Sequence, residues 1–155
     1  VLALQSRYPE LPHQALELEI TESAGSVELS RLQKVMGRFR ELGVSFALDD
    51  FGSQYSNLSL FANVRFDTVK LDRSLIAEMA GNPINRTLVR DIVGICQTYG
   101  MTCVAEGVET KAQEKTLLEI GCPCGQGYYF DKPIPVEQFE EKYLPMSCGV
   151  GAPLG

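Results

Sequence analysis

Acidic side chains stand at the ends of several short β-like runs in this sequence. Glu22 follows LELEIT, Asp49 and Asp50 close SFALDD, and Glu106 closes TCVAE. If these carboxylates meet, their mutual repulsion calls for positive charge among them. Oxygen ligands with no Cys or His beside them favour Mg2+ or Mn2+ over Zn2+. Two such ions can clamp the attacking and leaving oxygens of a phosphoryl displacement, so the pattern predicts a metal site for phosphodiester chemistry.

A lysine and a further aspartate stand among these acidic residues. Lys70 and Asp72 are two apart on the run TVKLD, so their side chains are expected to share one face of a strand. One interpretation is an ordinary ion pair on a solvated face. The other is that Lys70 adds a fixed positive charge near a phosphate or water. The acidic ends of consecutive strands favour the second, since unrelated surface carboxylates would be scattered over helices and both rims.

Short β-like runs alternate with helix-like runs along the chain. The strand candidates are LELEIT (from Leu16), SFALD (from Ser45), TVKLD (from Thr68), TCVAE (from Thr102) and GYYF (from Gly127). Two predicted helices have apolar faces formed by Leu32, Val35, Met36, Phe39 and Leu42, and by Ile84, Leu88, Ile92, Ile95 and Tyr99. A shorter helix is predicted after Thr110 as its N-cap, and a last one from Pro135. This alternation is typical of βα units around a parallel sheet.

Five such strands fit either an open doubly wound sheet or part of a (β/α)8 barrel. In a barrel, the side chains that do chemistry gather at the carboxyl-terminal ends of the strands. The acidic residues and Lys70 stand at such positions, so we predict an α/β fold that is part of a TIM-like barrel. A complete barrel needs about 250 residues, which leaves this chain of 155 roughly three strands short.

The composition limits the partners and the compartment. The chain has 20 acidic and 14 basic residues, and its net charge of -6 argues against broad binding of DNA or RNA. It contains no apolar run near the ~20 residues that cross a bilayer and no export signal, so we expect a cytoplasmic location. The five cysteines are expected to be reduced thiols, and Cys122 and Cys124 lack the second ligand pair of a structural zinc site.

Five strings of the sequence resemble those of EAL domains, in the same order and at about the same spacing. They are LELEITES, ALDDFGSQYSNL, FDTVKLDRSLI, VAEGVET and GQGYYFDKPIP, and the similarity runs from about Leu16 to Leu144. The resemblance implies a TIM-like barrel of the EAL type without its N-terminal strands. It also implies hydrolysis of cyclic di-GMP to the linear dinucleotide pGpG with two divalent ions, Mg2+ or Mn2+. We therefore expect residues 1–145 to form a truncated EAL domain and 146–155 an irregular tail.

The resemblance assigns metal-binding roles to four acidic residues. Glu22, Asp49 and Asp50 look like metal ligands, with Asp50 as the bridge between the two ions. Glu106 is similar to the carboxylate that meets the metals and the attacking water, either as a ligand or as the general base.

The resemblance also implies roles for residues around the metals. Lys70 corresponds to the lysine beside the catalytic water and substrate, and Asp72 to its neighbour on the same face. Glu109 corresponds to the glutamate that steadies the loop after the aspartate pair. Gln126 lies where the family places a glutamine near the substrate and water.

Two features depart from the pattern of the family. The Glu-Ala-Leu motif that names it, and the asparagine of the following strand, would stand before Val1 and have no replacement in this sequence. Two expected metal ligands are therefore missing. Gln54 stands where the family usually has glycine, which adopts backbone angles that cost a glutamine free energy. Either the metal-site loop is altered or Gln54 is a tolerated surface residue.

Two functional hypotheses follow from the residues and the resemblance. The first is a metal-dependent cyclic di-GMP phosphodiesterase, of which this chain alone is expected to have little or no activity. The second is a catalytically silent EAL-like module that binds cyclic di-GMP or a protein partner. A third and more remote hypothesis is an unrelated barrel enzyme for phosphorylated metabolites. Uncovered strand edges predict that the chain is at least dimeric, and sensory or diguanylate cyclase domains can accompany EAL domains in a parent protein.

Overall fold

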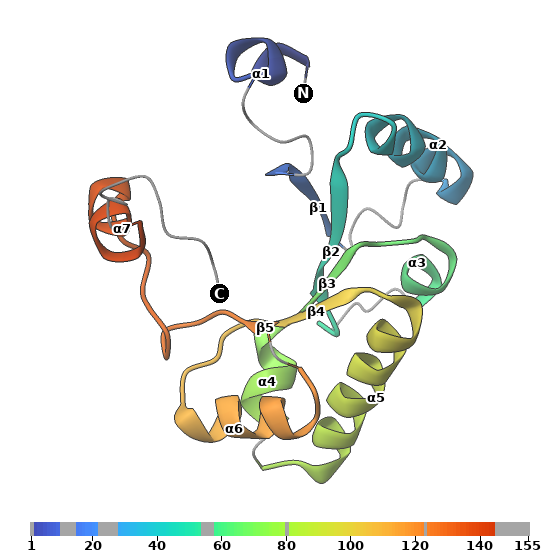
Figure 1. The fold of residues 1–155 in the computed structure, drawn as a ribbon. Helices are drawn as coiled ribbons and strands as arrows, with labels where there is room; N and C mark the ends of the chain where they lie inside the picture. The colour runs from blue at the N-terminus through green and yellow to red at the C-terminus, as the bar shows by residue number, and fades with distance from the viewer. Residues whose placement is uncertain are drawn as a thin grey trace, which may run out of the picture.

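The computed structural model describes residues 2–9, 15–21, 28–53, 58–79, 81–122 and 124–144. Within them, five strands alternate with helices (Figure 1). The strands are β1 (Glu17–Thr21), β2 (Ser45–Phe51), β3 (Thr68–Leu71), β4 (Thr102–Ala105) and β5 (Cys124–Gly125). The helices are α1 (Leu2–Arg7), α2 (Leu29–Arg40), α3 (Leu58–Asn63), α4 (Arg73–Met79), α5 (Pro83–Tyr99), α6 (Lys111–Glu119) and α7 (Val136–Tyr143).

The strands form one parallel sheet in the order β1-β2-β3-β4-β5. Each strand therefore pairs with its neighbour in the chain, and a helix lies in each connection. A doubly wound sheet reverses its strand order at one point, and the described strands show no such reversal. The fold is thus α/β with a parallel five-stranded sheet, consistent with the predicted part of a TIM-like barrel.

Local sequence signals explain where the helices beside the sheet begin and end. The Asn82 side chain accepts hydrogen bonds from the backbone N–H groups of Ile84 and Asn85, and Pro83 opens α5. The same helix ends at Gly100, whose φ of 68° is easy for glycine. At α6, Thr110 and Gln113 form a capping box, which confirms Thr110 as the predicted N-cap.

The hydrophobic core lies between the sheet and the helices that cover it. It contains Leu48, Val69 and Leu71 from the strands together with Phe46 and Phe66, all buried. Phe39 and Phe61 are half-buried and pack against it. In contrast, no residue of α7 is buried, and Figure 1 shows this helix standing away from the sheet.

The predicted apolar face of α5 is wrong, although the helix itself is where the pattern placed it. Ile84, Leu88, Ile95 and Tyr99 are exposed, whereas Val89, Ile92, Val93 and Cys96 are buried. The helix has apolar residues on two adjoining stripes that share Ile92. The stripe formed by Val89, Ile92, Val93 and Cys96 faces the core.

The last predicted strand, GYYF, is also wrong. Residues 127–130 form a turn, and the fifth strand is the shorter segment β5 that precedes it. The Phe130 N–H donates to the Gly127 carbonyl at 3.0 Å, and the Tyr129 N–H donates to the Val108 carbonyl at 3.0 Å. A side chain at position 127 would meet Val108 backbone oxygen at 2.2 Å, so this close approach requires glycine. The chain therefore turns away despite the high β-propensity of its tyrosines.

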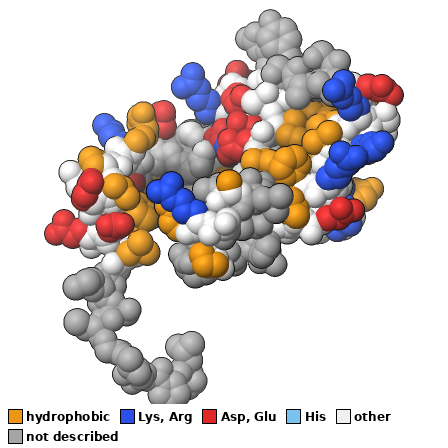
Figure 2. Space-filling model, turned by 90° about the horizontal axis from the view of Figure 1, so that it is seen from above, with side chains coloured by type: hydrophobic (Ala, Val, Ile, Leu, Met, Phe, Trp, Pro, Cys, Tyr) orange, Lys and Arg blue, Asp and Glu red, His pale blue; other side chains and the backbone are white. Residues whose placement is uncertain are grey.

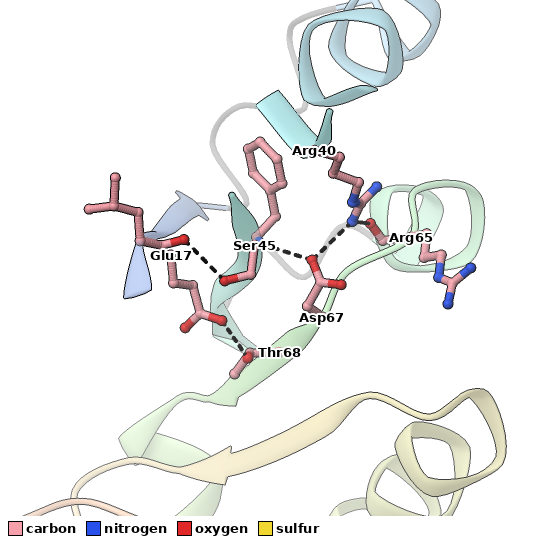
Figure 3. Close-up of polar contacts among 8 residues, drawn as sticks. Glu17, Arg40, Ser45, Arg65, Asp67 and Thr68 are labelled. Carbon is pink, nitrogen blue, oxygen red and sulfur yellow. Dashed lines mark hydrogen bonds and ion pairs between the residues drawn. The ribbon is translucent and has the colours of Figure 1, made fainter. Parts of the chain in front are cut away.

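The amino-terminal ends of β1, β2 and β3 are held by a group of polar contacts (Figure 3). Asp67 accepts hydrogen bonds from the Phe46 N–H at 2.9 Å and from the Arg40 guanidinium at 3.2 Å. The Thr68 hydroxyl donates to the Glu17 carboxylate at 2.6 Å. These contacts hold the three strands in alignment at this end. The register at their opposite, carboxyl-terminal ends is fixed as a result.

Two sequence predictions concern membranes and thiols. Among the described residues, no helix combines the length and apolar character that a bilayer crossing requires. Cys96, Cys103 and Cys122 are buried free thiols, and Cys124 is an exposed one. His13, Gln54, Cys148 and the predicted tail 146–155 lie outside the described residues.

Candidate functional site

Three carboxylates meet at the carboxyl-terminal edge of the sheet. Asp49 and Asp50 lie near the end of β2, and Glu106 follows β4 directly. One oxygen from each of the three lies within 4.8 Å of the others. The structure therefore brings together three of the four acidic residues predicted for one site, while Glu22 lies outside the described residues.

A local irregularity of β2 lets two consecutive aspartates reach this cluster. Successive side chains of a regular strand point to opposite faces. Here the pairing with β3 shifts register between Leu48 and Phe51, and Asp50 has a φ of 55°, in the left-handed region. This backbone conformation costs a non-glycine residue about 1–2 kcal/mol. The bend explains how Asp49 and Asp50 come to be neighbours at one rim, which the strand pattern alone does not predict.

The ammonium of Lys70, a residue of β3, contacts three carboxylates at once. Its Nζ is 2.8 Å from Asp49 Oδ1, 2.8 Å from Glu19 Oε1 and 2.9 Å from Glu106 Oε1. Only 13% of the lysine side chain is exposed. Burial acts to lower the pKa of the Lys70 ammonium, but its contacts with Asp49, Glu19 and Glu106 outweigh this and raise the pKa above its ordinary value. Lys70 is thus a permanently charged member of the cluster.

Glu19 is the member of this network that sequence reasoning missed. It lies on β1, where Glu17, Glu19 and Thr21 alternate with apolar residues and so share one face of the sheet. The polar alternation was a usable signal, because the other face of the same strand has Leu18 and Ile20. The sequence pattern predicts Glu22 instead, three residues further along the chain, because it follows the end of the predicted strand.

Gln126 is held directly against the cluster. Its Nε2 donates a hydrogen bond to Glu106 Oε1 at 2.6 Å. Its own backbone is fixed on both sides, since its N–H donates to Ala105 at 2.8 Å and its carbonyl accepts from Val108 at 3.0 Å. The short strand β5 therefore positions the glutamine that orients the Glu106 carboxylate.

Asp72 and Glu109 occupy different places from the cluster. Asp72 lies just past the end of β3. Its carboxylate accepts hydrogen bonds from the Ser74 N–H at 2.9 Å and from the Ser74 hydroxyl, at the start of α4. Glu109 is exposed and lines the cleft described next.

A cleft of about 440 Å3 opens next to Glu106 and Gln126. Arg73 and Lys132 contribute positive charge to its lining, and Tyr128 contributes an aromatic ring. The Lys132 ammonium lies 5.5 Å from the centre of the Tyr128 ring. Three carboxylates, those of Glu106, Glu109 and Asp131, line the same cleft, so the groups that complement an anionic ligand with an aromatic part are Arg73, Lys132 and Tyr128.

The surface also has a second hollow and an uneven distribution of charged side chains. A hollow of about 520 Å3 beside α7 is lined mainly by apolar side chains and contains none of the acidic cluster. On the face seen in Figure 2, one group of acidic side chains lies near the upper middle, and further acidic and basic side chains lie toward both sides. The two cations that line the cleft thus stand among carboxylates, on a chain whose net charge is -6.

The donor set of the acidic cluster fits a hard divalent cation. Asp49, Asp50 and Glu106 offer only carboxylate oxygens, the ligand type that Mg2+ and Mn2+ prefer. The buried Oδ1 of Asp49 is paired with Lys70 but accepts no hydrogen bond of good geometry. A buried carboxylate oxygen in this condition is suited to a metal ligand.

Known proteins with similar sequences and structures identify the family. The family model for the EAL domain matches residues 2–133. Signaling protein YkoW of Bacillus subtilis is 37% identical over 85% of this chain, and cyclic di-GMP phosphodiesterase NbdA of Pseudomonas aeruginosa is 38% identical over 81%. The matched part is 16% of the length of each of these two relatives.

Solved structures agree with this match. The EAL domain of Mycobacterium smegmatis DcpA superimposes with a TM-score of 0.83 and 36% identity, covering 90% of this chain and 62% of that one. The manganese and cyclic di-GMP complex of Klebsiella pneumoniae BlrP1 superimposes with a TM-score of 0.77 and 31% identity, covering 85% of this chain and 34% of that one. The sequence match and the shared fold lead to one conclusion: this chain belongs to the EAL domain family.

Proposed function

We propose that this chain supplies metal-binding and catalytic residues of a phosphodiesterase that hydrolyses cyclic di-GMP to pGpG. The observation that carries the proposal is the meeting of Asp49, Asp50 and Glu106 at one rim, next to a cleft whose lining includes Arg73 and Lys132. The activity named for NbdA and the manganese and cyclic di-GMP bound by BlrP1 support it.

Asp49, Asp50 and Glu106 would hold Mg2+ or Mn2+, with Glu22 as a further proposed ligand. Glu19 extends the cluster across β1 through Lys70 and is a candidate for the same role. When bound, divalent ions supply Lewis acidity and lower the pKa of a water at the phosphodiester. The carboxylates provide the negative charge that concentrates cations at this rim.

The remaining site residues would act on the substrate side of the cluster. Gln126 donates to Glu106 Oε1 and so fixes which oxygen of that carboxylate faces the ions or the attacking water. Arg73 and Lys132 would attract the phosphates of the cyclic dinucleotide into the cleft, and Tyr128 offers a surface for a guanine base. We propose that Lys70 and Gln126 contact the substrate or the attacking water, and that Asp72 and Glu109 keep the loops around them in place.

The assay for this proposal is the appearance of pGpG from cyclic di-GMP in the presence of Mg2+ or Mn2+, followed by chromatography. The assay should be run on this chain and on any longer protein that contains it, because the chain covers only part of the length of its relatives. Glu106→Gln should abolish turnover in the active form, whereas Glu41→Gln, the same change on an exposed residue at the end of α2, should not. Turnover that survives in Glu106→Gln contradicts the proposed role.

Binding without turnover would instead support the second hypothesis, a silent regulatory module. Isothermal titration with cyclic di-GMP, with and without Mn2+, separates the two. A chain that binds the nucleotide but never releases pGpG, even within a longer protein, is a receptor rather than an enzyme.

Self-association of the chain is also a proposal. β1 and β5 are the edges of the described sheet, and exposed apolar side chains line α5. Both kinds of surface favour pairing with another chain. Light scattering at micromolar concentration should give at least the mass of a dimer, and a monomer mass would contradict the proposal.

A further inference from the structure

The position of the Lys70 ammonium conflicts with that of a bound cation. Its Nζ contacts Asp49 Oδ1 at 2.8 Å and Glu106 Oε1 at 2.9 Å, two members of the proposed metal site. A divalent ion held by these carboxylates would lie about 2.0–2.1 Å from its ligand oxygens if it were Mg2+. Two positive charges would then compete for the same two carboxylates at a separation of only a few ångströms, which strong repulsion opposes.

Charge balance explains why the lysine lies there. Glu19, Asp49 and Glu106 come from three separate strands or strand ends, and each contacts the same ammonium. Asp49 and Glu106 have only 16% of their side chains exposed, so their charges are poorly screened by water. Without a cation among them, carboxylates this close would repel one another and weaken the carboxyl-terminal edge of the sheet.

We propose that Lys70 is an internal counterion of the acidic cluster that competes with a divalent ion for Asp49 and Glu106 and is released from them when the ion binds. This inference rests on the proposed metal site and adds a regulatory role to it. The lysine keeps the metal-free rim folded and raises the metal concentration at which the site fills. Once released, its ammonium is free to turn toward the phosphate or water near Glu106.

The first test compares Mn2+ affinities by titration calorimetry. Lys70→Met keeps the length of the side chain and removes its charge, so Mn2+ should bind on the order of tenfold more tightly. The metal-free form of this variant should melt at a lower temperature than the wild type. Lys70→Arg keeps the charge and should stay near the wild-type affinity. Arg86→Gln removes an equal charge from the Arg86–Glu119 pair on the helical side and should leave Mn2+ binding unchanged.

The second test needs no variant and detects the release itself. The wild-type protein is acetylated briefly with acetic anhydride at increasing Mn2+ concentrations, and each lysine is quantified by mass spectrometry. Lys70 acetylation should rise with the same half-saturation as Mn2+ binding. Lys115, whose side chain is 79% exposed, serves as the internal control and should not change.

The outcomes separate this inference from the proposed function. If the wild type binds Mn2+ but Lys70 acetylation stays constant and Lys70→Met binds no more tightly, the counterion role is overturned and the metal site stands. If the wild type binds no Mn2+, the proposed metal site and the counterion role are both overturned.

Discussion

Gly107 and Gly100 provide a matched test of how closely the site is packed. Both have left-handed backbone angles, with φ of 66° and 68°. A Cβ at Gly100 would meet no atom within 4 Å, whereas at Gly107 it would lie 2.5 Å from Arg73 Cβ and 3.4 Å from Arg73 Cα. Alanine at either position suffers the left-handed backbone cost, but only position 107 adds a steric clash.

The expected losses of stability follow from the left-handed backbone cost and the steric clash. Gly100→Ala should lower the free energy of unfolding by about 1–2 kcal/mol, the left-handed cost alone. Gly107→Ala should add about 1–3 kcal/mol of overpacking, for a total of about 2–5 kcal/mol. The clash cannot relax freely, because the Glu106 N–H on one side donates to Leu71 and the Val108 N–H on the other donates to Gln126, both at 3.0 Å.

Urea unfolding followed by circular dichroism measures both variants under the same conditions. Because Gly107 follows Glu106 directly, Gly107→Ala should also weaken Mn2+ binding, while Gly100→Ala should not. Replacing Arg73 by glycine in the Gly107→Ala background removes the clashing Cβ and should recover part of the lost stability. Equal destabilisation of the two alanine variants, within about 0.5 kcal/mol, would refute the packing argument.

Three further predictions concern the fold around the site. Asn82→Ala removes the N-cap of α5 and should lower the free energy of unfolding by about 0.5–2 kcal/mol in urea titrations; no change would contradict the capping role. Asp67→Ala leaves a backbone N–H of β2 without its acceptor and leaves the Arg40 guanidinium with the Arg65 carbonyl alone, so thermal melts should show a loss of about 1–3 kcal/mol. The ammonium of Lys142 is the main cause that lowers the pKa of Asp131 from 3.8 to about 2. Because the folded-state pKa is depressed, this contact stabilises the protein above about pH 4 and its contribution is lost as the pH falls toward 2. The stability difference between wild type and Asp131→Asn should shrink over that range, and a constant difference would exclude the contact.

The strands that position the site were predictable because their local signals agree with the tertiary structure. β1 to β4 are runs with β-branched or apolar residues that end in polar ones, and they lie where the pattern placed them. The run GYYF failed because its aromatic residues suggest a strand, whereas the close contact between Gly127 and Val108 forces a turn. That contact joins distant parts of the chain, so no local pattern reveals it.

The sequence predicted which residues form the site but not how they are arranged in space. Asp49, Asp50 and Glu106 were recognised at strand ends, and the structure brings them together. The left-handed Asp50 that makes this possible depends on the register between β2 and β3, which sequence spacing does not determine. Lys70 was expected near the cluster, yet its central place among three carboxylates, with Glu19 as one of them, depends on strand pairing.

The electron paramagnetic resonance signal of free Mn2+, titrated with this chain, measures the central claim directly. The wild type should remove Mn2+ from solution, and Asp50→Asn should bind it at least about tenfold more weakly. Asp91→Asn, the same change on the exposed surface of α5, should match the wild type. If Asp50→Asn and the wild type bind Mn2+ equally, the carboxylates at the end of the sheet do not form the metal site.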